Sequence, residues 1–425
     1  MSRSINSNAV IELIRKSAIE FKDQKDFDPL IQAIGEAKLV LLGEASHGTS
    51  EFYTTRIQLT KRLISEKKFR FIGVEGDWPA FYKVNQYIKG HPNAPQSARD
   101  LLNCFDRWPT WMWANEEVIS LLDWLKAYNM ERPYYEKVGF YGLDLYSLWE
   151  SMESILVYLE RIGSRDIDKA KQVLKCFHPH DRKPQDYGVH AAFFSEDCIE
   201  EVVHLLTTIQ KNKKFYTNDE EEQLHLEMNA LVTVNAEAFY RAMVQGGPDS
   251  WNIRDRHMTE CLLKIMAHHG EEAKGIVWEH NTHVGDARAT TMVADGEVNV
   301  GQLVREHFGE HEVFIAGFGS YQGTVIASQA WGDPFKVMDV PPAVTESWES
   351  LFHRARPADQ YIILREENLP FQLVKGHRAI GVVYEPRYEQ FGNYVPTNLA
   401  KRYNAFIFHD QTTALHPLDV AHAIV

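Results

Sequence analysis

The sequence predicts an α/β protein whose mainly parallel sheet is flanked by helices on both faces and carries a large helical insertion. Strands buried on both faces are near-continuous apolar runs, and in a parallel sheet they alternate with helices. Both patterns occur here, together with one long stretch that has helical periodicity alone. The aliphatic runs, each followed by polar residues or glycines, are KLVLLGEASH (38–47), FRFIGVEGD (69–77), KVGFYGLDL (137–145), KGIVWEHNTH (274–283) and HEVFIAGFGS (311–320).

Helical stretches accompany these runs. TTRIQLTKRLISEKK (54–68) follows the first run, and EEVISLLDWLKAYN (116–129) precedes the third. Near the start of the chain, the apolar residues within 10–19 recur at helical spacing, which predicts an amphipathic first helix. Because strands and helices alternate, we expect helices on both faces of the sheet.

The segment between the third and fourth runs, 146–270, is too long for an ordinary crossover connection. Its helical periodicity indicates an insertion that covers the cleft, while 1–145 and 271–425 form the α/β core that carries the active-site strand ends. Its clearest helical stretches are SLWESMESILVYLERI (147–162), SEDCIEEVVHLLTTIQ (195–210) and EEEQLHLEMNALVTVNAEAFYRAMV (220–244). After about residue 335, the short segments YIILRE (361–366), AIGVVYEP (379–386) and NAFIFHDQ (404–411) either extend the sheet or form a small hairpin layer.

The composition argues against some classes of binding partner. The chain has 425 residues and a net charge of −14, from 45 basic and 59 acidic residues, which argues against binding to nucleic acid or to an anionic membrane. No apolar stretch is long enough to cross a bilayer, and we expect a cytoplasmic protein. The cysteines are widely separated and form no C-x-x-C pair, so the sequence predicts neither a zinc ribbon nor a disulfide framework.

Ionisable residues follow four of the five predicted strands. In open parallel sheets, ligands bind outside the carboxyl ends of the strands, which share one edge. Side chains delivered to that edge by four strands therefore predict a functional site. They are Glu44 and His47 after the first run, Glu75 and Asp77 after the second, Asp144 after the third, and Glu279, His280 and His283 after the fourth.

Some of these residues also fit structural roles. Asp77 precedes Trp78-Pro79 and is well placed to cap the following helix, and Asp144 can be interpreted in the same way. A lone histidine is more often structural than catalytic, and this alternative stays open for His280.

Arg56 supports the site independently. It lies on an otherwise apolar helix face within 52–63, so its guanidinium needs an anionic partner. Helical side chains lean toward the N-terminus, which directs Arg56 toward Glu44 or Glu75. Arg254, in the insertion, is a weaker candidate, for which a solvated or capping role is the alternative.

These residues favour hydrolysis by an activated water. His47, oriented by Glu44 or Glu75, takes a proton from the water, while Arg56 and His283 stabilise the negative charge that forms on a carbonyl oxygen. A covalent route is disfavoured because the G-x-S-x-G nucleophile motif is absent. The His280-x-x-His283 spacing with nearby carboxylates leaves a metal site as an alternative.

The motifs resemble those of a known family. GEASHGTSEF (43–52), Arg56, IGVEGDW (72–78) and WEHNTHVGD (278–286) are similar to the hallmarks of the erythromycin esterase family, over about residues 30–420. The resemblance implies a hydrolase of macrolide lactone esters that confers antibiotic resistance. We expect this hydrolase to need no metal or other cofactor. It also implies that His47 is the general base. The site positions that it implies are Glu44, His47, Arg56, Glu75, His280 and His283.

The substrate is expected to be a small-molecule ester, with Asp144, Tyr321 and Arg254 as binding residues. AWGDPF (330–335) and the tryptophans of RWPTWMW (107–113) are candidates for lining an apolar cleft, although such residues more often belong to a core. The wider superfamily leaves two alternatives: a metal-dependent hydrolase, and a non-catalytic binding protein for haem or another apolar ligand.

Overall fold

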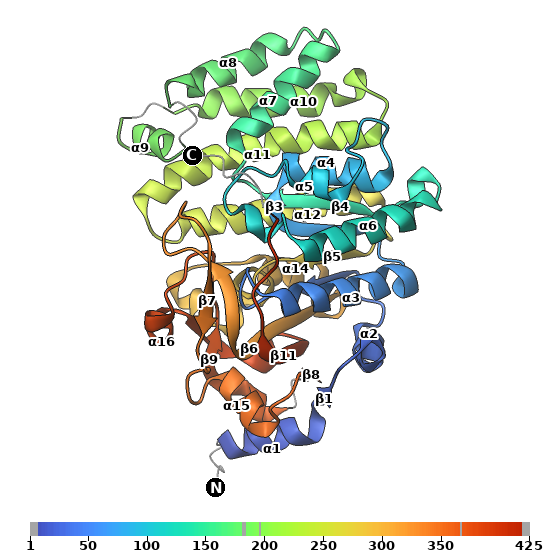
Figure 1. Ribbon diagram of the computed structural model, residues 1–425. Coiled ribbons are helices and arrows are strands. Elements are labelled where there is room, and N and C mark those ends of the chain that lie inside the picture. Colours follow the sequence, from blue (N-terminus) through green and yellow to red (C-terminus); the bar gives the residue numbers. More distant parts are fainter. Residues whose placement is uncertain (1–6, 181–183, 195–196, 366–367, 419–425) are drawn as a thin grey trace.

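Figure 1 shows the computed structural model, which describes residues 7–180, 184–194, 197–365 and 368–418. Within these residues nine strands form one sheet in the order β1-β8-β11-β6-β2-β5-β3-β4, and β7 pairs with β6. The strands are β1 (Ile19–Glu20), β2 (Leu39–Leu42), β3 (Phe71–Asp77), β4 (Gly139–Asp144), β5 (Gly275–Trp278), β6 (Val313–Ala327), β7 (Lys336–Val340), β8 (Gln360–Ile363) and β11 (Ala405–Thr412).

The sheet is mainly parallel, which confirms the predicted fold class. All neighbouring pairs from β11 to β4 in this order are parallel, whereas β1, β8 and β7 pair in the antiparallel direction. The first four aliphatic runs contain β2, β3, β4 and β5, and the fifth contains the first part of β6. The sheet order differs from the chain order, because β5 lies between β2 and β3.

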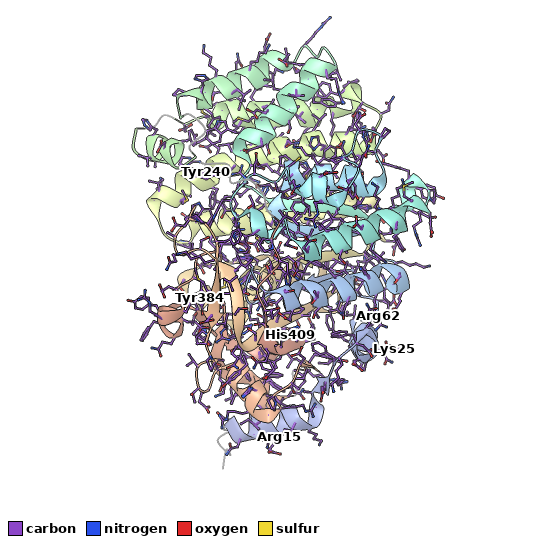
Figure 2. The ribbon with its side chains drawn as sticks, viewed as in Figure 1. Arg15, Lys25, Arg62, Tyr240, Tyr384 and His409 are labelled. Carbon is purple, nitrogen blue, oxygen red and sulfur yellow. A yellow bond between two sulfur atoms is a disulfide. The ribbon has the colours of Figure 1, made fainter. Side chains whose placement is uncertain are left out.

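A group of helices, α7 to α11, packs around its own apolar core above the sheet in Figure 1. Tyr240 of α11, labelled in Figure 2, belongs to this core. The next helix, α12, packs on β4 and the sheet instead. The bounds of these helices are α7 (Leu148–Arg161), α8 (Ile167–Phe177), α9 (Pro184–Phe194), α10 (Ile199–Tyr216), α11 (Glu220–Gln245) and α12 (Asp249–His269).

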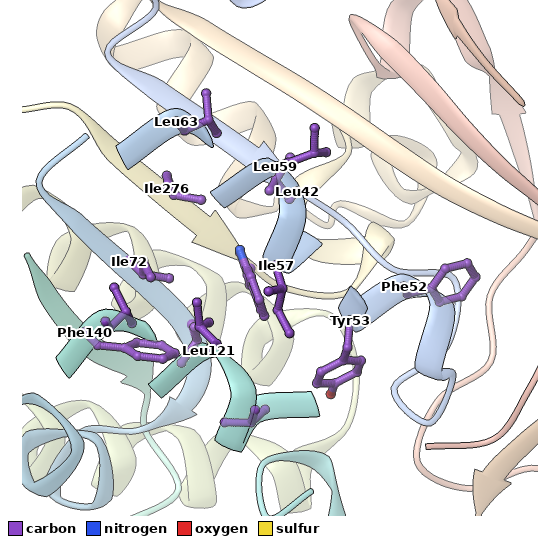
Figure 3. Close-up of a cluster of buried hydrophobic side chains, with 14 of the residues drawn as sticks. Leu42, Phe52, Tyr53, Ile57, Leu59, Leu63, Ile72, Leu121, Phe140 and Ile276 are labelled. Atoms are coloured by element: carbon purple, nitrogen blue, oxygen red, sulfur yellow. The ribbon is translucent and has the colours of Figure 1, made fainter. Parts of the chain in front are cut away.

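Alternate residues of the buried strands face two different cores, as expected for a sheet with helices on both faces. In β2, Val40 and Leu42 face the core shared with α2 to α6, part of which is drawn in Figure 3. Leu39 and Leu41 face the core shared with α1, α12, α14 and α15. The remaining helices are α1 (Ser7–Ser17), α2 (Asp28–Ile34), α3 (Ser50–Lys67), α4 (Trp78–Lys89), α5 (Ala98–Leu102), α6 (Glu116–Met130), α13 (Asn281–Val284), α14 (Val300–Phe308), α15 (Trp348–Ala355), α16 (Glu389–Gly392) and α17 (Leu399–Arg402).

The structure corrects the prediction about cysteines. Cys176, in α8, and Cys198, just before α10, form a disulfide. The two residues are 22 positions apart, and they meet because α8 and α10 pack against each other, a contact that their spacing does not reveal.

The late segments follow the two predicted options only in part. YIILRE and NAFIFHDQ contain β8 and β11, which extend the sheet. AIGVVYEP forms no strand, and the hairpin layer consists of β9 (Val374–Arg378) and β10 (Tyr394–Asn398). The ends of two predicted segments, 195–196 and 366, lie outside the described residues. In the part of the chain that the structure describes, no helix is long and apolar enough to cross a bilayer.

Candidate active site

Four neighbouring strands, β4, β3, β5 and β2, bring their carboxyl ends to one edge of the sheet. Because all four are parallel, the residues that follow them meet there. The insertion of β5 between β2 and β3 places His280 and His283 between the groups that come from those two strands. The sheet order thus assembles one site from segments that are far apart in the chain.

The loop that carries Glu44 and His47, residues 43–49, is fixed by backbone hydrogen bonds. The Glu44 carbonyl accepts from the Asn281 N–H at 2.8 Å. The Gly48 carbonyl accepts from the N–H groups of Ile326 and Leu415, each at 3.0 Å. The loop is therefore held by β6 and by the chain beyond β11, which limits the movement of its side chains.

Glu44 joins His47 to Arg56. Its Oε1 lies 2.8 Å from His47 Nδ1, and Oε2 accepts a hydrogen bond from Arg56 Nη2. The Arg56 guanidinium also lies over the rings of Tyr53 and Trp278, at 4.5 and 4.6 Å. All three polar side chains are at least nine-tenths buried. The direction predicted for Arg56 is confirmed, and its partner is Glu44.

This pairing sets the proton on the His47 ring. The Glu44 carboxylate accepts from Nδ1–H, so Nε2 of the neutral ring is the free acceptor. Nε2 has no hydrogen-bond partner among the described residues. Burial lowers the pKa of His47, but the charge of Glu75 and the hydrogen bond and charge of Glu44 outweigh it, so that the pKa lies above its ordinary value. The ring is thus a stronger base than a solvated imidazole.

Arg254 of α12 lies at the centre of a second group. Its Nε and Nη2 donate to Asp144 at 2.9 and 2.6 Å, and Nη2 also donates to Glu75 at 2.7 Å. Nη1 lies 3.1 Å from His283 Nε2. The solvated or capping role considered for Arg254 is wrong, because its guanidinium joins two strand ends and a histidine. Arg256, two residues later, is exposed.

His283 is oriented by a residue that the sequence did not indicate. Both oxygens of the buried Asp255 lie near His283 Nδ1, at 2.9 and 3.0 Å. The ring stacks on Trp251, with 4.5 Å between the ring centres. Asp255 accepts from Nδ1–H, so Nε2 accepts from Arg254. Both nitrogens of His283 therefore have partners within the protein.

Glu75 is an anion held among cationic and basic groups. Burial raises the pKa of Glu75, but His283, His47 and Arg254 lower it more, and the net shift is strongly downward. One oxygen accepts from Arg254 and the other from the His280 N–H at 2.9 Å. Glu75 thus links the two groups of the site electrostatically.

Asp77, at the end of the same strand, does not cap α4. Its side chain accepts no capping hydrogen bond from that helix and instead lies 2.5 Å from Arg107. Burial raises the pKa of Asp77 to about 6, even with this partner. The capping interpretation is therefore wrong for this residue.

His280 offers a free hydrogen-bond donor. Its Nδ1 accepts from the Thr282 N–H at 3.3 Å and lies 2.8 Å from the Thr282 hydroxyl, so the proton of the neutral ring is on Nε2. This Nε2 is buried and has no partner in the described residues. Burial keeps the pKa of His280 well below its ordinary value, and the ring centre lies 5.0 Å from that of His47.

Comparison with known proteins identifies the family. The erythromycin esterase family model matches residues 64–412, most of the chain. The chain belongs to the erythromycin esterase family. Among curated members, erythromycin esterase type II of Escherichia coli is 24% identical over 343 residues, which is 74% of this chain and 78% of the relative. The putative hydrolase YbfO of Bacillus subtilis (strain 168) is 21% identical over 413 residues, which is 92% of this chain and 87% of the relative.

Solved structures have the same fold. A protein from Bacillus cereus superposes with a TM-score of 0.81 at 20% identity, over 97% of this chain and all of that one. A mutant of the erythromycin esterase EreC, in its open conformation, gives a TM-score of 0.69 at 16% identity, over 95% and 99% of the two chains. At these identities the structures support the fold. Membership of the erythromycin esterase family suggests an ester hydrolase with a small-molecule substrate.

In this family member, sequence reasoning missed Asp255 and Trp251. Both lie on α12 at i and i+4 with Arg254 between them, and one helical turn therefore presents three groups to His283. Because Arg254 was already a candidate, this spacing could have indicated Trp251 and Asp255 as its neighbours on the same helix face. Tyr321 lies in other surroundings, with its ring stacked on His353 of α15 at 3.6 Å. Its role in substrate binding stays a prediction that these contacts do not support.

The metal alternative lacks a ligand set in this erythromycin esterase fold. Among the described residues, no group of three or more His, Cys, Asp or Glu side chains converges as metal ligands would. Glu279 comes nearest to a free ligand, because both of its oxygens are buried without partners. Burial raises the pKa of Glu279 well above its ordinary value, which favours the neutral carboxyl group over the anion that a metal ion would need.

Proposed function

We propose that the protein hydrolyses carboxylic esters or lactones with a water molecule activated by His47. The observation that carries the proposal is the His47–Glu44–Arg56 arrangement, which fixes the imidazole tautomer and leaves Nε2 free. Nucleophile activation by a buried, oriented histidine is a common route to acyl transfer. Membership of the erythromycin esterase family supports the same reaction class.

The proposed reaction uses His47 twice. Nε2 takes a proton from the water as its oxygen attacks the ester carbonyl carbon, which gives a tetrahedral intermediate. The carbon–oxygen bond to the alcohol then breaks, and the protonated His47 returns the proton to the leaving oxygen. Products are a carboxylic acid and an alcohol, and no other reactant is needed.

The negative charge on the intermediate needs hydrogen-bond donors. The expected donors were Arg56 and His283, but both nitrogens of His283 are engaged, by Asp255 and Arg254. Arg56 donates from Nη2 to Glu44, and its Nε has no partner, but the guanidinium lies over the rings of Tyr53 and Trp278. The His280 ring, in contrast, lies 5.0 Å from that of His47. We therefore assign this role to the unpartnered Nε2–H of His280. A pre-positioned neutral donor in a buried site stabilises an oxyanion without reorganisation of solvent.

The proposed substrate is a small-molecule ester, and macrolide lactones belong to the class to be tested because one relative is an erythromycin esterase. Asp144 and Arg254 lie beside the catalytic groups and are proposed to position the substrate. The helical insertion 146–270, which contains α7 to α12, is proposed to cover the cleft. A cytoplasmic location is part of the proposal.

The test compares His47→Gln with His311→Gln, a matched change at an exposed histidine. Hydrolysis of a panel of aryl esters and macrolides is measured for both variants. His47→Gln should lower kcat by about 10²–10⁴-fold, the usual contribution of a general base, with an unchanged circular dichroism spectrum. His311→Gln should retain full activity, because His311 is 81% exposed at the side chain.

Two further measurements distinguish the proposed hydrolase from a metal-dependent hydrolase and from a haem-binding protein. Activity of the wild-type protein should persist in EDTA; loss of activity that returns on addition of Zn²⁺ would favour the metal-dependent reading. A Soret band after reconstitution with haem, without hydrolysis of any ester, would favour a haem-binding protein. An active His47→Gln variant would reject the proposed base.

A further inference from the structure

An aromatic surface adjoins the polar site. The side chains of Trp108, Trp331 and Tyr146, here named the aromatic platform, come from three separate segments: the chain before α6, the connection between β6 and β7, and the chain after β4. The ring centres of Trp108 and Trp331 lie 4.5 Å apart, and those of Trp331 and Tyr146 lie 6.4 Å apart. The Trp331 ring thus neighbours both of the other rings.

Trp331 is the exposed part of the aromatic platform. Its side chain is 60% exposed, whereas Trp111 and Trp113 of the same tryptophan-rich stretch as Trp108 are buried in the core. Trp108 also donates from Nε1 to the Asp333 carbonyl at 3.0 Å, which joins its segment to that of Trp331. The exposure of a large ring in a fixed position indicates a surface that a ligand can cover.

Tyr146 connects the aromatic platform to the catalytic groups. The Arg254 guanidinium lies over the Tyr146 ring at 5.0 Å, and the same guanidinium donates to Glu75 and Asp144. The Tyr146 carbonyl accepts from the Tyr240 hydroxyl at 3.2 Å, so α11, whose Tyr240 is labelled in Figure 2, fixes this segment. The Tyr146 ring therefore lies between the exposed Trp331 indole and the polar group around Arg254.

We propose that the aromatic platform binds an apolar ring of the ester substrate while the reacting carbonyl lies beside His47. The inference rests on the proposed function and narrows its substrate class to esters that carry a large apolar ring. The planes of the two indoles are tilted by 55°, so a flat ring that stacks on Trp331 has the Trp108 ring at its edge. This contact removes apolar surface from water on both partners, and flat rings gain most from it. Small aliphatic esters lack a group that reaches the platform.

The test measures steady-state kinetics of Trp331→Ala with naphthyl acetate and with ethyl acetate. With naphthyl acetate, KM should rise about tenfold with kcat changed less than about twofold, because stacking is lost and the catalytic groups are untouched. With ethyl acetate, kcat/KM should stay within about twofold of wild type. Trp331→Phe should restore most of the affinity, since it keeps a flat ring.

Phe215→Ala is the matched control, because this ring is 86% exposed and belongs to the outer helix α10. It should leave both substrates unaffected. Equal effects of Trp331→Ala on the two esters, or no effect on either, would overturn the inference while the esterase proposal stands. If the wild-type protein hydrolyses no ester of the panel, the proposed function fails, and this inference fails with it.

Discussion

The pKa of the His47 imidazole is set by influences of opposite sign. Burial and the charge of Arg254 favour the neutral ring, whereas the charge of Glu75 and the hydrogen bond and charge of Glu44 favour the protonated one and prevail. A base with a raised pKa accepts a proton more readily, but it is available only when the pH exceeds that pKa. In the proposed reaction, the same two carboxylates therefore determine both the strength of His47 as a base and the pH range in which it acts.

This gives a pH prediction. The acid limb of kcat/KM should lie above 6.5, the ordinary value for imidazole, because activity falls as the pH drops through the raised pKa of His47. Glu44→Gln removes one of the groups that raise the pKa, so the limb should move to lower pH, with a lower plateau because the tautomer is less well fixed. A pH profile of both proteins checks this. A limb at or below 6.5 in the wild type would contradict it.

Some residues of the candidate site could be predicted from the sequence, and others could not. Glu44, His47 and Glu75 follow apolar runs, and the general rule about strand ends predicts their meeting. Asp255 and Trp251 come from a helix in the middle of the chain, and their approach to His283 depends on how α12 packs on the sheet. The i, i+4 spacing marks the two residues as neighbours of Arg254, but no local pattern shows that they pack against His283.

At the level of elements, the loop 43–49 fixes the position of His47, the proposed base, relative to the sheet. Its carbonyl at Gly48 accepts from two separate segments, and an added Cβ at Gly48 would lie 2.0 Å from the Ile326 carbonyl oxygen. Only glycine lets the loop approach β6 this closely. The extension of β6 beyond β2 thus serves as a support for the loop that holds His47.

Gly48→Ala should therefore move the loop. We expect a loss of about 1–3 kcal/mol in the free energy of unfolding, typical of overpacking against backbone, together with reduced kcat. Chemical denaturation and kinetics measure the two effects. Gly381→Ala is the control, because a Cβ there meets nothing within 4 Å, and its effect should stay within about 0.5 kcal/mol. Equal stability of the two variants would show that the close approach is not required.

At the scale of the whole molecule, two regions differ in whether their apolar cores include residues of the sheet. The cores on the two sheet faces include residues from almost every strand, whereas the core of α7 to α11 consists of helical residues and the chain after β4. Regions with a core of their own can open while the rest stays folded. The outer helices α8 and α10 should therefore be the less stable part.

Hydrogen exchange with mass spectrometry tests this. Under native conditions, amides of α8 and α10 should exchange faster than those of β2 and β5, because opening the outer helices leaves the sheet intact. The comparison uses hydrogen-bonded amides in both regions, so local fraying is avoided. Equal protection of both regions, at the level of global unfolding, would show that the helices and the sheet unfold as one unit.

The sequence by itself determined the five strands β2 to β6, their parallel arrangement and the chemical groups at their ends, because continuous apolar runs and the residues after them are local features. It did not determine the sheet order, the disulfide between Cys176 and Cys198, or the central place of Arg254. These depend on which distant segments pack together. Only the tertiary structure decided that β5 lies between β2 and β3 and that α12 turns Arg254 and Asp255 toward His283, because packing energy is shared among many residues and leaves no local pattern.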